Sequence, residues 1–509
     1  MKTDIVLTTL NARYIHTAFG LRYLQANLQE LESHSCIREF TLHQRPLDIA
    51  EQLLALQPRI IGLGVYIWNA EQSLQLVRLL KTLAPEVSLV LGGPEVSFEQ
   101  EQQPICQLAD LVLSGPAEAS FYRLCREILG APVEPLETAP EGRQALEALR
   151  LPYYLYSDED LAQRVLYVEA SRGCPFKCEF CLSALDKTAW PFPLEPFMGE
   201  LDRLYQRGAR HFKFVDRTFN LNIRVSLSIL QFFLDRVPDD PVQNDLFVHF
   251  EVIPDRLPGA LKEMIGRFPP GALQFEVGVQ TFNPRVQAII QRKQDDARTR
   301  ENLAWLSKRA SVHIHTDLIF GLPGEDIQSM ARSFNQLVAL GPEEIQLGIL
   351  KRLRGMPMVK QEQEYALRFN PNPPYEILSS RDVDFSSMQR LRRMARYWDL
   401  VANSGRFRHT LPGILGDAPF ERFMRLSEWL YARTGQTHKI NLMRLFDLLY
   451  AALSEEFRLQ AQEVLAGLQK DYDRSGLKGL PQCLRRTQDL SLVSPGKRGG
   501  NRRQRAHRS

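Results

Sequence analysis

The sequence predicts an α/β protein in three parts: a doubly wound parallel sheet, a second series of βα units that forms a partial barrel, and a helical C-terminal domain. In residues 4–129 and again in 166–350, short apolar runs alternate with helix-like segments. Runs that are apolar at every position are typical of parallel strands covered by helices on both faces. After about residue 375 these runs disappear and helical periodicity takes over.

The first part is expected over residues 1–130 as a Rossmann-like domain. Its predicted strands are residues 4–8, 37–42, 60–66, 88–91 and 111–113. Its predicted helices are residues 18–32, 48–56, 70–83, 98–108 and 117–129. Residues 131–160 hold several prolines among small and acidic residues, which indicates a linker.

The second part is expected over residues 161–375. Six strands are predicted, at residues 166–170, 211–215, 248–253, 274–279, 313–319 and 345–350. Six βα units fit a partial (β/α)6 barrel, in which the chemistry belongs at the carboxyl ends of the strands.

The third part is expected over residues 376–490, with helices at 386–404, 420–433, 440–452 and 454–472. Residues 491–509 follow as a basic tail. Its last residues, 497–509, contain six Lys or Arg and no acid, so we expect the tail to be disordered.

Composition places the chain among ordinary globular proteins. Of its 509 residues 44% are hydrophobic and 24% charged. No apolar run is long enough to span a bilayer, and the first residues lead into a strand without a signal-peptide segment. We therefore expect a cytoplasmic protein without a membrane partner. No folded nucleic-acid module is visible, so nucleic acid is not an expected partner.

Three of the seven cysteines are clustered in one loop. Cys174, Cys178 and Cys181 have the spacing C-x3-C-x2-C and directly follow the strand predicted at 166–170. Three thiolates can hold three irons of a cubane cluster and leave the fourth iron open. A structural zinc site normally needs four ligands, and the fourth is not evident. His211 would complete such a site only by folding back.

This loop, with aromatic Phe180 before its third cysteine, resembles the cluster-binding loop of the radical S-adenosylmethionine (SAM) superfamily. The resemblance implies a [4Fe–4S] cluster on Cys174, Cys178 and Cys181 that cleaves SAM to a 5′-deoxyadenosyl radical. It also implies an electron donor of the flavodoxin or ferredoxin type. Residues at the places of the family's SAM contacts are Phe180, Asp216, Glu276, Gln280, Arg292 and Asp317.

Two of these SAM candidates stand where the family has a characteristic residue. The family's Gly-Gly-Glu after the second strand is missing here, and Asp216 is the polar candidate in its place. Arg292 stands where relatives carry an arginine that pairs with the SAM carboxylate.

The N-terminal part resembles the cobalamin-binding class of this superfamily. Its loops at 11–24, 62–69, 92–95 and 114–118 follow predicted strands, at the edge where open α/β sheets bind ligands. The candidate cobalamin contacts are His16, Tyr66, Trp68, Gly92, Gly93, Gly115 and Glu118.

His16 departs from the pattern of cobalt-ligating histidines. Such domains carry Asp-x-His-x-x-Gly, but residue 14 is a tyrosine. The resemblance therefore implies a cobalamin cleft without histidine ligation, in which His16 is a hydrogen-bonding loop residue. A domain that keeps the fold and binds no corrinoid is the alternative.

The three parts together resemble a subgroup of radical SAM proteins with a DUF4080-type C-terminal domain. The resemblance implies a cobalamin-dependent radical SAM enzyme, a methyltransferase acting on an unactivated carbon of an unknown substrate. The alternatives are another radical reaction such as rearrangement or ring contraction, RNA modification, or a non-catalytic corrinoid or cluster sensor. Residues 351–355 carry three positive charges after the sixth strand, which favours either an anionic substrate or a solvated basic loop.

Overall fold

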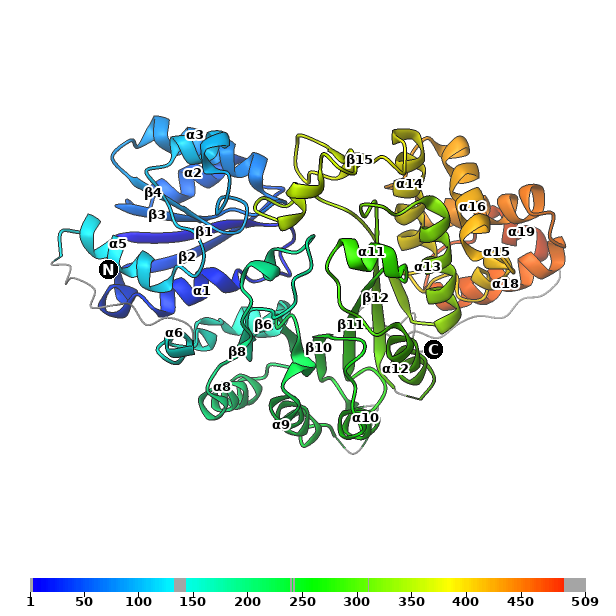
Figure 1. Cartoon of the computed structure of the whole chain (residues 1–509), viewed down its shortest axis with the longest axis horizontal. Coiled ribbons are helices and arrows are strands. Elements are labelled where there is room, and N and C mark those ends of the chain that lie inside the picture. Colours follow the sequence, from blue (N-terminus) through cyan, green and yellow to red (C-terminus); the bar gives the residue numbers. More distant parts are fainter. Residues whose placement is uncertain (1–2, 132–142, 239, 241–242, 310, 489–509) are drawn as a thin grey trace.

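The three predicted parts lie side by side in the computed structural model, which describes residues 3–131, 143–238, 240, 243–309 and 311–488 (Figure 1). The N-terminal sheet and the C-terminal helices flank the central sheet, and the segment around β15 lies between them (Figure 1). The predicted basic tail, residues 491–509, and residues 132–142 of the predicted linker lie outside the described residues. Within the described residues no helix is long and apolar enough to cross a membrane.

The N-terminal sheet is parallel with strand order β2-β1-β3-β4-β5. Its strands are β1 (Ile5–Asn11), β2 (Ser35–Thr41), β3 (Ile60–Gly64), β4 (Ser88–Gly92) and β5 (Leu111–Val112). Its helices are α1 (Phe19–Ala26), α2 (Pro46–Leu54), α3 (Ala70–Leu83), α4 (Pro104–Leu108) and α5 (Glu118–Ile128). Residues of α2, α3 and α4 form one apolar core, and residues of α1 and α5 form another. The doubly wound architecture is thus confirmed.

Two predicted helices of this domain are shorter than expected. The helix expected at 18–32 ends at Ala26 and is followed by a 3₁₀ segment, Gln29–His34, because Gln29 has a φ of 50°. The helix expected at 98–108 begins only at Pro104, because Glu99 has a φ of 53°. A left-handed residue interrupts the helical hydrogen-bond ladder in both places.

The central sheet is parallel and open, with strand order β13-β12-β11-β10-β9-β6. Its strands are β6 (Leu166–Val168), β9 (His211–Phe214), β10 (Phe247–Val252), β11 (Leu273–Gln280), β12 (His313–Phe320) and β13 (Glu344–Ile349). The helices between them are α8 (Leu194–Gln206), α9 (Ile223–Leu234), α10 (Gly259–Gly266), α11 (Pro284–Ile289), α12 (Asp296–Arg309) and α13 (Ile327–Leu340). The six predicted strands and the partial barrel are confirmed.

The C-terminal part is helical, as predicted. Its helices are α14 (Phe385–Val401), α15 (Leu411–Leu415), α16 (Pro419–Thr434), α17 (Leu442–Ala451), α18 (Ala461–Ser475) and α19 (Gln482–Gln488). The helix expected at 454–472 begins at Ala461 instead, because Ala452–Glu456 form a π turn that continues α17 and Arg458 has a φ of 54°.

Short elements also lie where none was predicted. A hairpin of β14 (Arg368–Phe369) and β15 (Ile377–Ser379) precedes α14. The predicted linker contains α6 (Arg143–Glu147), a 3₁₀ turn (Tyr153–Leu155) and α7 (Asp158–Gln163). Helix α7 begins with a capping box, in which Ser157 and Asp160 exchange hydrogen bonds between side chain and backbone.

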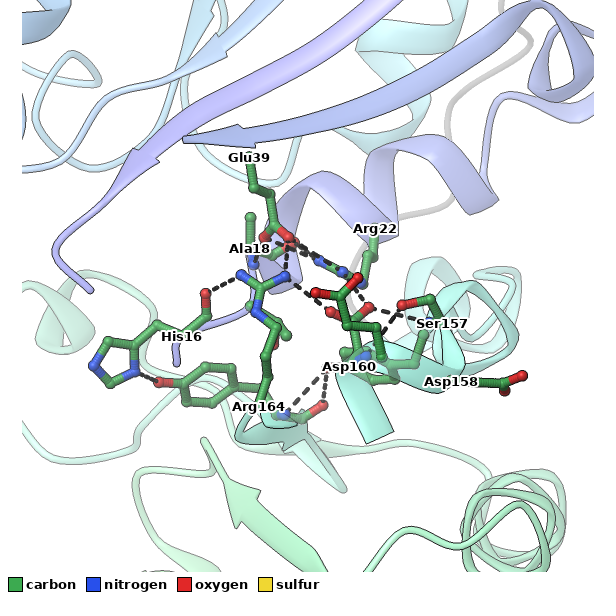
Figure 2. Close-up of polar contacts among 12 residues, drawn as sticks. His16, Ala18, Arg22, Glu39, Ser157, Asp158, Asp160 and Arg164 are labelled. Carbon is green, nitrogen blue, oxygen red and sulfur yellow. Dashed lines mark hydrogen bonds and ion pairs between the residues drawn. The ribbon is translucent and has the colours of Figure 1, made fainter. Parts of the chain in front are cut away.

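A buried ion-pair network joins the N-terminal sheet to this segment (Figure 2). Arg22 of α1 lies 3.1 Å from Glu39 of β2 and 2.8 Å from Asp160 of α7. Arg164, the residue directly after α7, contacts Asp160 at 2.8 Å and also pairs with Glu39. The exposed fractions of these four side chains are only 5–11%. Burial by itself raises the pKa of Glu39, but the charges and hydrogen bonds of the two arginines lower it overall.

We predict that the substitution Glu39→Gln destabilises the protein by about 3–5 kcal/mol, because it leaves two buried guanidinium groups short of a countercharge. Urea denaturation followed by circular dichroism measures the effect. Asp48→Asn is the control, because it breaks the exposed Arg45–Asp48 pair and should leave the urea midpoint almost unchanged. Equal midpoints for the two variants would contradict the prediction.

Candidate functional site

The cysteine loop is closed by a short hairpin at the carboxyl end of β6. Strand β7 (Ser171–Arg172) pairs antiparallel with β8 (Trp190–Pro191), and the loop between them carries the three cysteines. Gly173 has a φ of 98°, and a Cβ there would lie 2.4 Å from the Thr188 carbonyl oxygen. Only glycine therefore allows the chain to enter the loop in this way.

Glu179, which the sequence analysis did not select, fixes the loop to the barrel. Its backbone N–H donates to the Ile290 carbonyl at 3.0 Å, and its carbonyl accepts from Met358 N–H at 3.0 Å. Its buried carboxylate accepts hydrogen bonds from the side-chain amides of Gln291 and Gln361. Nothing in the spacing of the cysteines marks this residue, because its partners lie more than a hundred positions away.

The three thiols line one cavity of about 260 Å³. Five of the six predicted SAM contacts line it as well: Phe180, Glu276, Gln280, Arg292 and Asp317. Among the described residues, no three His, Cys, Asp or Glu side chains are grouped closely enough to hold a single metal ion. Thiolates of a cubane cluster bind different irons and do not need such a grouping. The donor set therefore fits a cluster with an open iron.

Two polar side chains beside the thiols are suited to a bound ligand. Arg292 donates to the Gly278 carbonyl oxygen, and its Nη1 lies 3.8 Å from Cys178 Sγ. Gln280 follows a register shift in β11 and has a φ of 70°. Its buried side-chain oxygen has no hydrogen-bond partner among the described residues. Such an atom is costly unless a ligand or water satisfies it.

The inner face of the barrel is charged. Strand β11 alternates buried and half-exposed residues, and Glu276 lies on the half-exposed face. His249 and Lys213 contact Glu276 at 3.1 and 3.6 Å. Burial raises the pKa of Glu276, but the hydrogen bond from His249 and the Lys213 charge lower it overall. Burial and the neighbouring Glu276 charge keep the pKa of Asp317 well above its usual range.

Asp216, the sixth SAM candidate, does not line this cavity. It is buried, and its carboxylate accepts hydrogen bonds from Ala170 N–H at 2.9 Å and Ser171 Oγ–H at 2.5 Å. These contacts hold the junction between β6 and the cysteine loop, and the assignment of Asp216 as a SAM contact stays a prediction. Burial is the main reason that its pKa rises to about 7.

A second cavity, of about 200 Å³, lies at the carboxyl edge of the N-terminal sheet. Five of the predicted cobalamin contacts line it: Tyr66, Gly92, Gly93, Gly115 and Glu118. Gly93 has a φ of 108°, and a Cβ there would lie 2.5 Å from the Val65 carbonyl oxygen. The absence of side chains at these glycines lets a flat ligand approach the backbone closely.

The other two cobalamin candidates lie elsewhere. Trp68 stacks on Tyr66 with ring centres 4.5 Å apart and faces the interdomain cavity described below. His16 lies at the boundary with the barrel, where Nδ1 is 2.7 Å from the Tyr167 hydroxyl and the carbonyl oxygen accepts from Arg164 (Figure 2). His16 thus hydrogen-bonds to protein and is not among the residues that line either cavity.

A third and larger cavity, the interdomain cavity, has a volume of about 1480 Å³. It shares Phe180, Cys181, Gln280 and Asp317 with the thiol-lined cavity, and it shares Gly115 with the glycine-lined cavity. Beside them, Arg172 donates to Glu118 at 2.8 Å and Glu169 at 2.6 Å, so the cysteine loop is tied to the glycine-lined edge. The thiol-lined and glycine-lined cavities therefore both border the interdomain cavity.

We predict that the stability of the Asp216→Asn variant depends less on pH than the stability of the wild type. A folded-state pKa of about 7 lies above the usual unfolded value of about 3.9, so the folded state binds the proton more tightly. Wild-type stability should therefore fall as pH rises from about 4 to about 7, and the variant should lose this component. Urea midpoints at pH 5 and pH 8 test the prediction. An equal difference between variant and wild type at both pH values would contradict it.

Three family models match the chain in order. They are "B12 binding domain" over residues 5–124, "Radical SAM superfamily" over residues 168–337 and "Protein of unknown function (DUF4080)" over residues 363–493.

Two named relatives are about a quarter identical to this chain over the residues that align. The "uncharacterized methyltransferase PH0819" of Pyrococcus horikoshii is 26% identical over 340 residues, which cover 60% of this chain and 70% of that protein. The "cobalamin-dependent radical SAM methyltransferase TokK" of Streptomyces tokunonensis is 26% identical over 358 residues, which cover 63% of this chain and 51% of that protein.

Two solved structures share the fold. The cobalamin-dependent radical enzyme OxsB matches 99% of this chain and 82% of its own, with a TM-score of 0.62 and 14% identity. The radical SAM methyltransferase TsrM of Kitasatospora setae matches 73% of this chain and 79% of its own, with a TM-score of 0.57 and 14% identity. The order of matched domains, together with the three thiols and the glycine-lined edge, identifies this chain as a B12-binding radical SAM protein with a DUF4080 C-terminal domain.

Proposed function

We propose that this protein is a cobalamin-dependent radical SAM methyltransferase that modifies an unactivated carbon of its substrate. The observation that carries the proposal is the interdomain cavity. Residues of the cysteine loop, the ends of the barrel strands and the N-terminal Trp68 and Gly115 all line it. A reaction that needs SAM, a corrinoid and a substrate together requires such a shared space.

In this proposal Cys174, Cys178 and Cys181 hold the cluster, which supplies the electron that cleaves SAM. Arg292, beside Cys178, binds the SAM carboxylate through charge-assisted hydrogen bonds. The unsatisfied side-chain oxygen of Gln280 accepts a hydrogen bond from the ligand. The protein's contribution is to position the reactants and to keep water from the radical.

The N-terminal edge holds the corrinoid, which supplies the methyl group. Gly92, Gly93 and Gly115 allow close contact with the backbone, and the indole of Trp68 offers a flat apolar surface in the interdomain cavity. The names of PH0819 and TokK, both described as methyltransferases, support a methyl-transfer outcome.

We also propose a reducing, cytoplasmic setting with a flavodoxin- or ferredoxin-type protein as electron donor. All seven cysteines are free thiols, and reduced thiols persist where glutathione and thioredoxin keep them so.

We predict that Cys178→Ala abolishes iron binding, because each thiolate holds a separate iron of the cluster. Iron content and visible absorption after anaerobic reconstitution measure the effect. Cys106→Ala removes a thiol outside the loop and should retain the wild-type iron content. Full iron in the Cys178 variant would exclude the assigned ligand set.

We predict that the reconstituted protein, reduced with dithionite, converts SAM to 5′-deoxyadenosine and, with cobalamin added, also forms S-adenosylhomocysteine. Arg292→Gln should raise the KM for SAM about tenfold or more, because a charged hydrogen bond contributes about 1.5–3 kcal/mol. Arg298→Gln, on the exposed surface of α12, is the matched control.

The two products separate the possible outcomes. Deoxyadenosine without S-adenosylhomocysteine would exclude methyl transfer and indicate another radical reaction. If neither product forms, the protein is not a radical SAM enzyme.

A further inference from the structure

The interdomain cavity has a third wall, which the C-terminal domain builds. Helix α14 presents Arg392, Ala395, Arg396 and Asp399 to it. These positions are spaced three and four residues apart, so they share one face of the helix. The opposite face, including Leu391, Met394 and Trp398, is buried in the core. Lys351, just after β13, lines the same wall.

Most charged side chains around the cavity are already paired. Arg172 contacts Glu118 and Glu169, and Arg217 contacts Glu251. Arg354 contacts Glu95 and Glu99, so this part of the basic segment at 351–355 braces the N-terminal domain and is not a solvated loop.

The charged side chains on the wall that α14 and Lys351 form are paired less completely. Arg392 pairs with Glu376, and Asp399 has an interaction of its own. For the side chains of Lys351 and Arg396, no carboxylate partner is found in the part of the chain that the structure describes. Lys351 forms a backbone bridge to Glu376, and Arg396 lies one helical turn beyond Arg392. The wall therefore carries two cations without a carboxylate partner among the described residues, and its one acidic side chain on α14 is Asp399, three positions after Arg396.

We propose that Lys351 and Arg396 bind an anionic group of the substrate, a carboxylate or a phosphate, and that the C-terminal domain thereby selects the substrate. This inference rests on the proposed function, because it places the substrate in the cavity that the SAM and corrinoid edges share. A concave wall that carries more cationic than anionic side chains attracts anions. The guanidinium of Arg396 matches the geometry of carboxylate and phosphate oxygens.

The test is calorimetric titration of the full-length protein with inorganic phosphate and, separately, with succinate at 150 mM potassium chloride. We expect the wild type to bind at least one anion and Lys351→Gln/Arg396→Gln to bind it about tenfold or more weakly. Stronger binding of phosphate indicates a phosphorylated substrate, and stronger binding of succinate indicates a carboxylate.

Arg390→Gln is the matched control. Arg390 lies on the same helix, pairs with Glu428 and does not line the cavity, so this variant should bind like the wild type. Unfolding midpoints of all variants show whether each is folded. A double variant that unfolds is replaced by the milder Lys351→Met/Arg396→Met pair, judged by the same criterion.

Three results would overturn the proposal: no binding of either anion to the wild type, equal binding to the double variant, or loss of hydroxocobalamin affinity in the double variant. The last would assign the two cations to the corrinoid. Failure of the proposed function would be seen separately, as absence of deoxyadenosine from the wild type without any substrate.

Discussion

The shared cavity depends on the buried network of Arg22, Glu39, Asp160 and Arg164. Each carboxylate contacts both guanidinium groups (Figure 2). Arg22 and Glu39 come from α1 and β2 of the N-terminal domain, whereas Asp160 and Arg164 come from α7 and the residue that follows it. Buried charges are tolerated only when they are fully paired. Few placements of the sheet against the barrel satisfy all four charges, so the network specifies how the two domains dock.

Two further connections fix the walls of the cavity. Arg172, two residues before Cys174, reaches Glu118 at the glycine-lined edge. Arg354, after β13, contacts Glu95 at 2.9 Å, and the Tyr375 hydroxyl donates to the same carboxylate at 2.6 Å. The cysteine loop, the glycine-lined edge and the last barrel strand are therefore held together by contacts between charged side chains.

Periodicity and spacing predicted much of this arrangement, because they report local structure. Strand β11 alternates as its sequence suggests, which places Glu276 and Gln280 on the same face. The spacing of the cysteines likewise indicated three thiols in one loop, and all three line one cavity. The positions of the Asp216 and His16 side chains were harder to predict from the sequence. Both residues lie in loops after strands, and the direction of these loops depends on distant partners. Ser171 draws the Asp216 carboxylate away from the cavity, and Tyr167 holds the His16 ring at the domain boundary. Likewise, the Glu179 carboxylate has its role through Gln291 and Gln361, which are distant in the sequence.

The C-terminal domain covers the edge strand that an open barrel leaves unpaired. Strand β13 is an edge strand, and its exposed backbone groups need partners. The Asn403 side chain accepts from Ile345 N–H and donates to the Ile345 carbonyl, both at 3.0 Å, as a neighbouring strand would. Helix α14 leads into Asn403 and packs on the same strand. Because its apolar face must cover β13, its polar face turns toward the cavity. Closing the edge of the barrel and lining the substrate space are therefore consequences of one amphipathic helix.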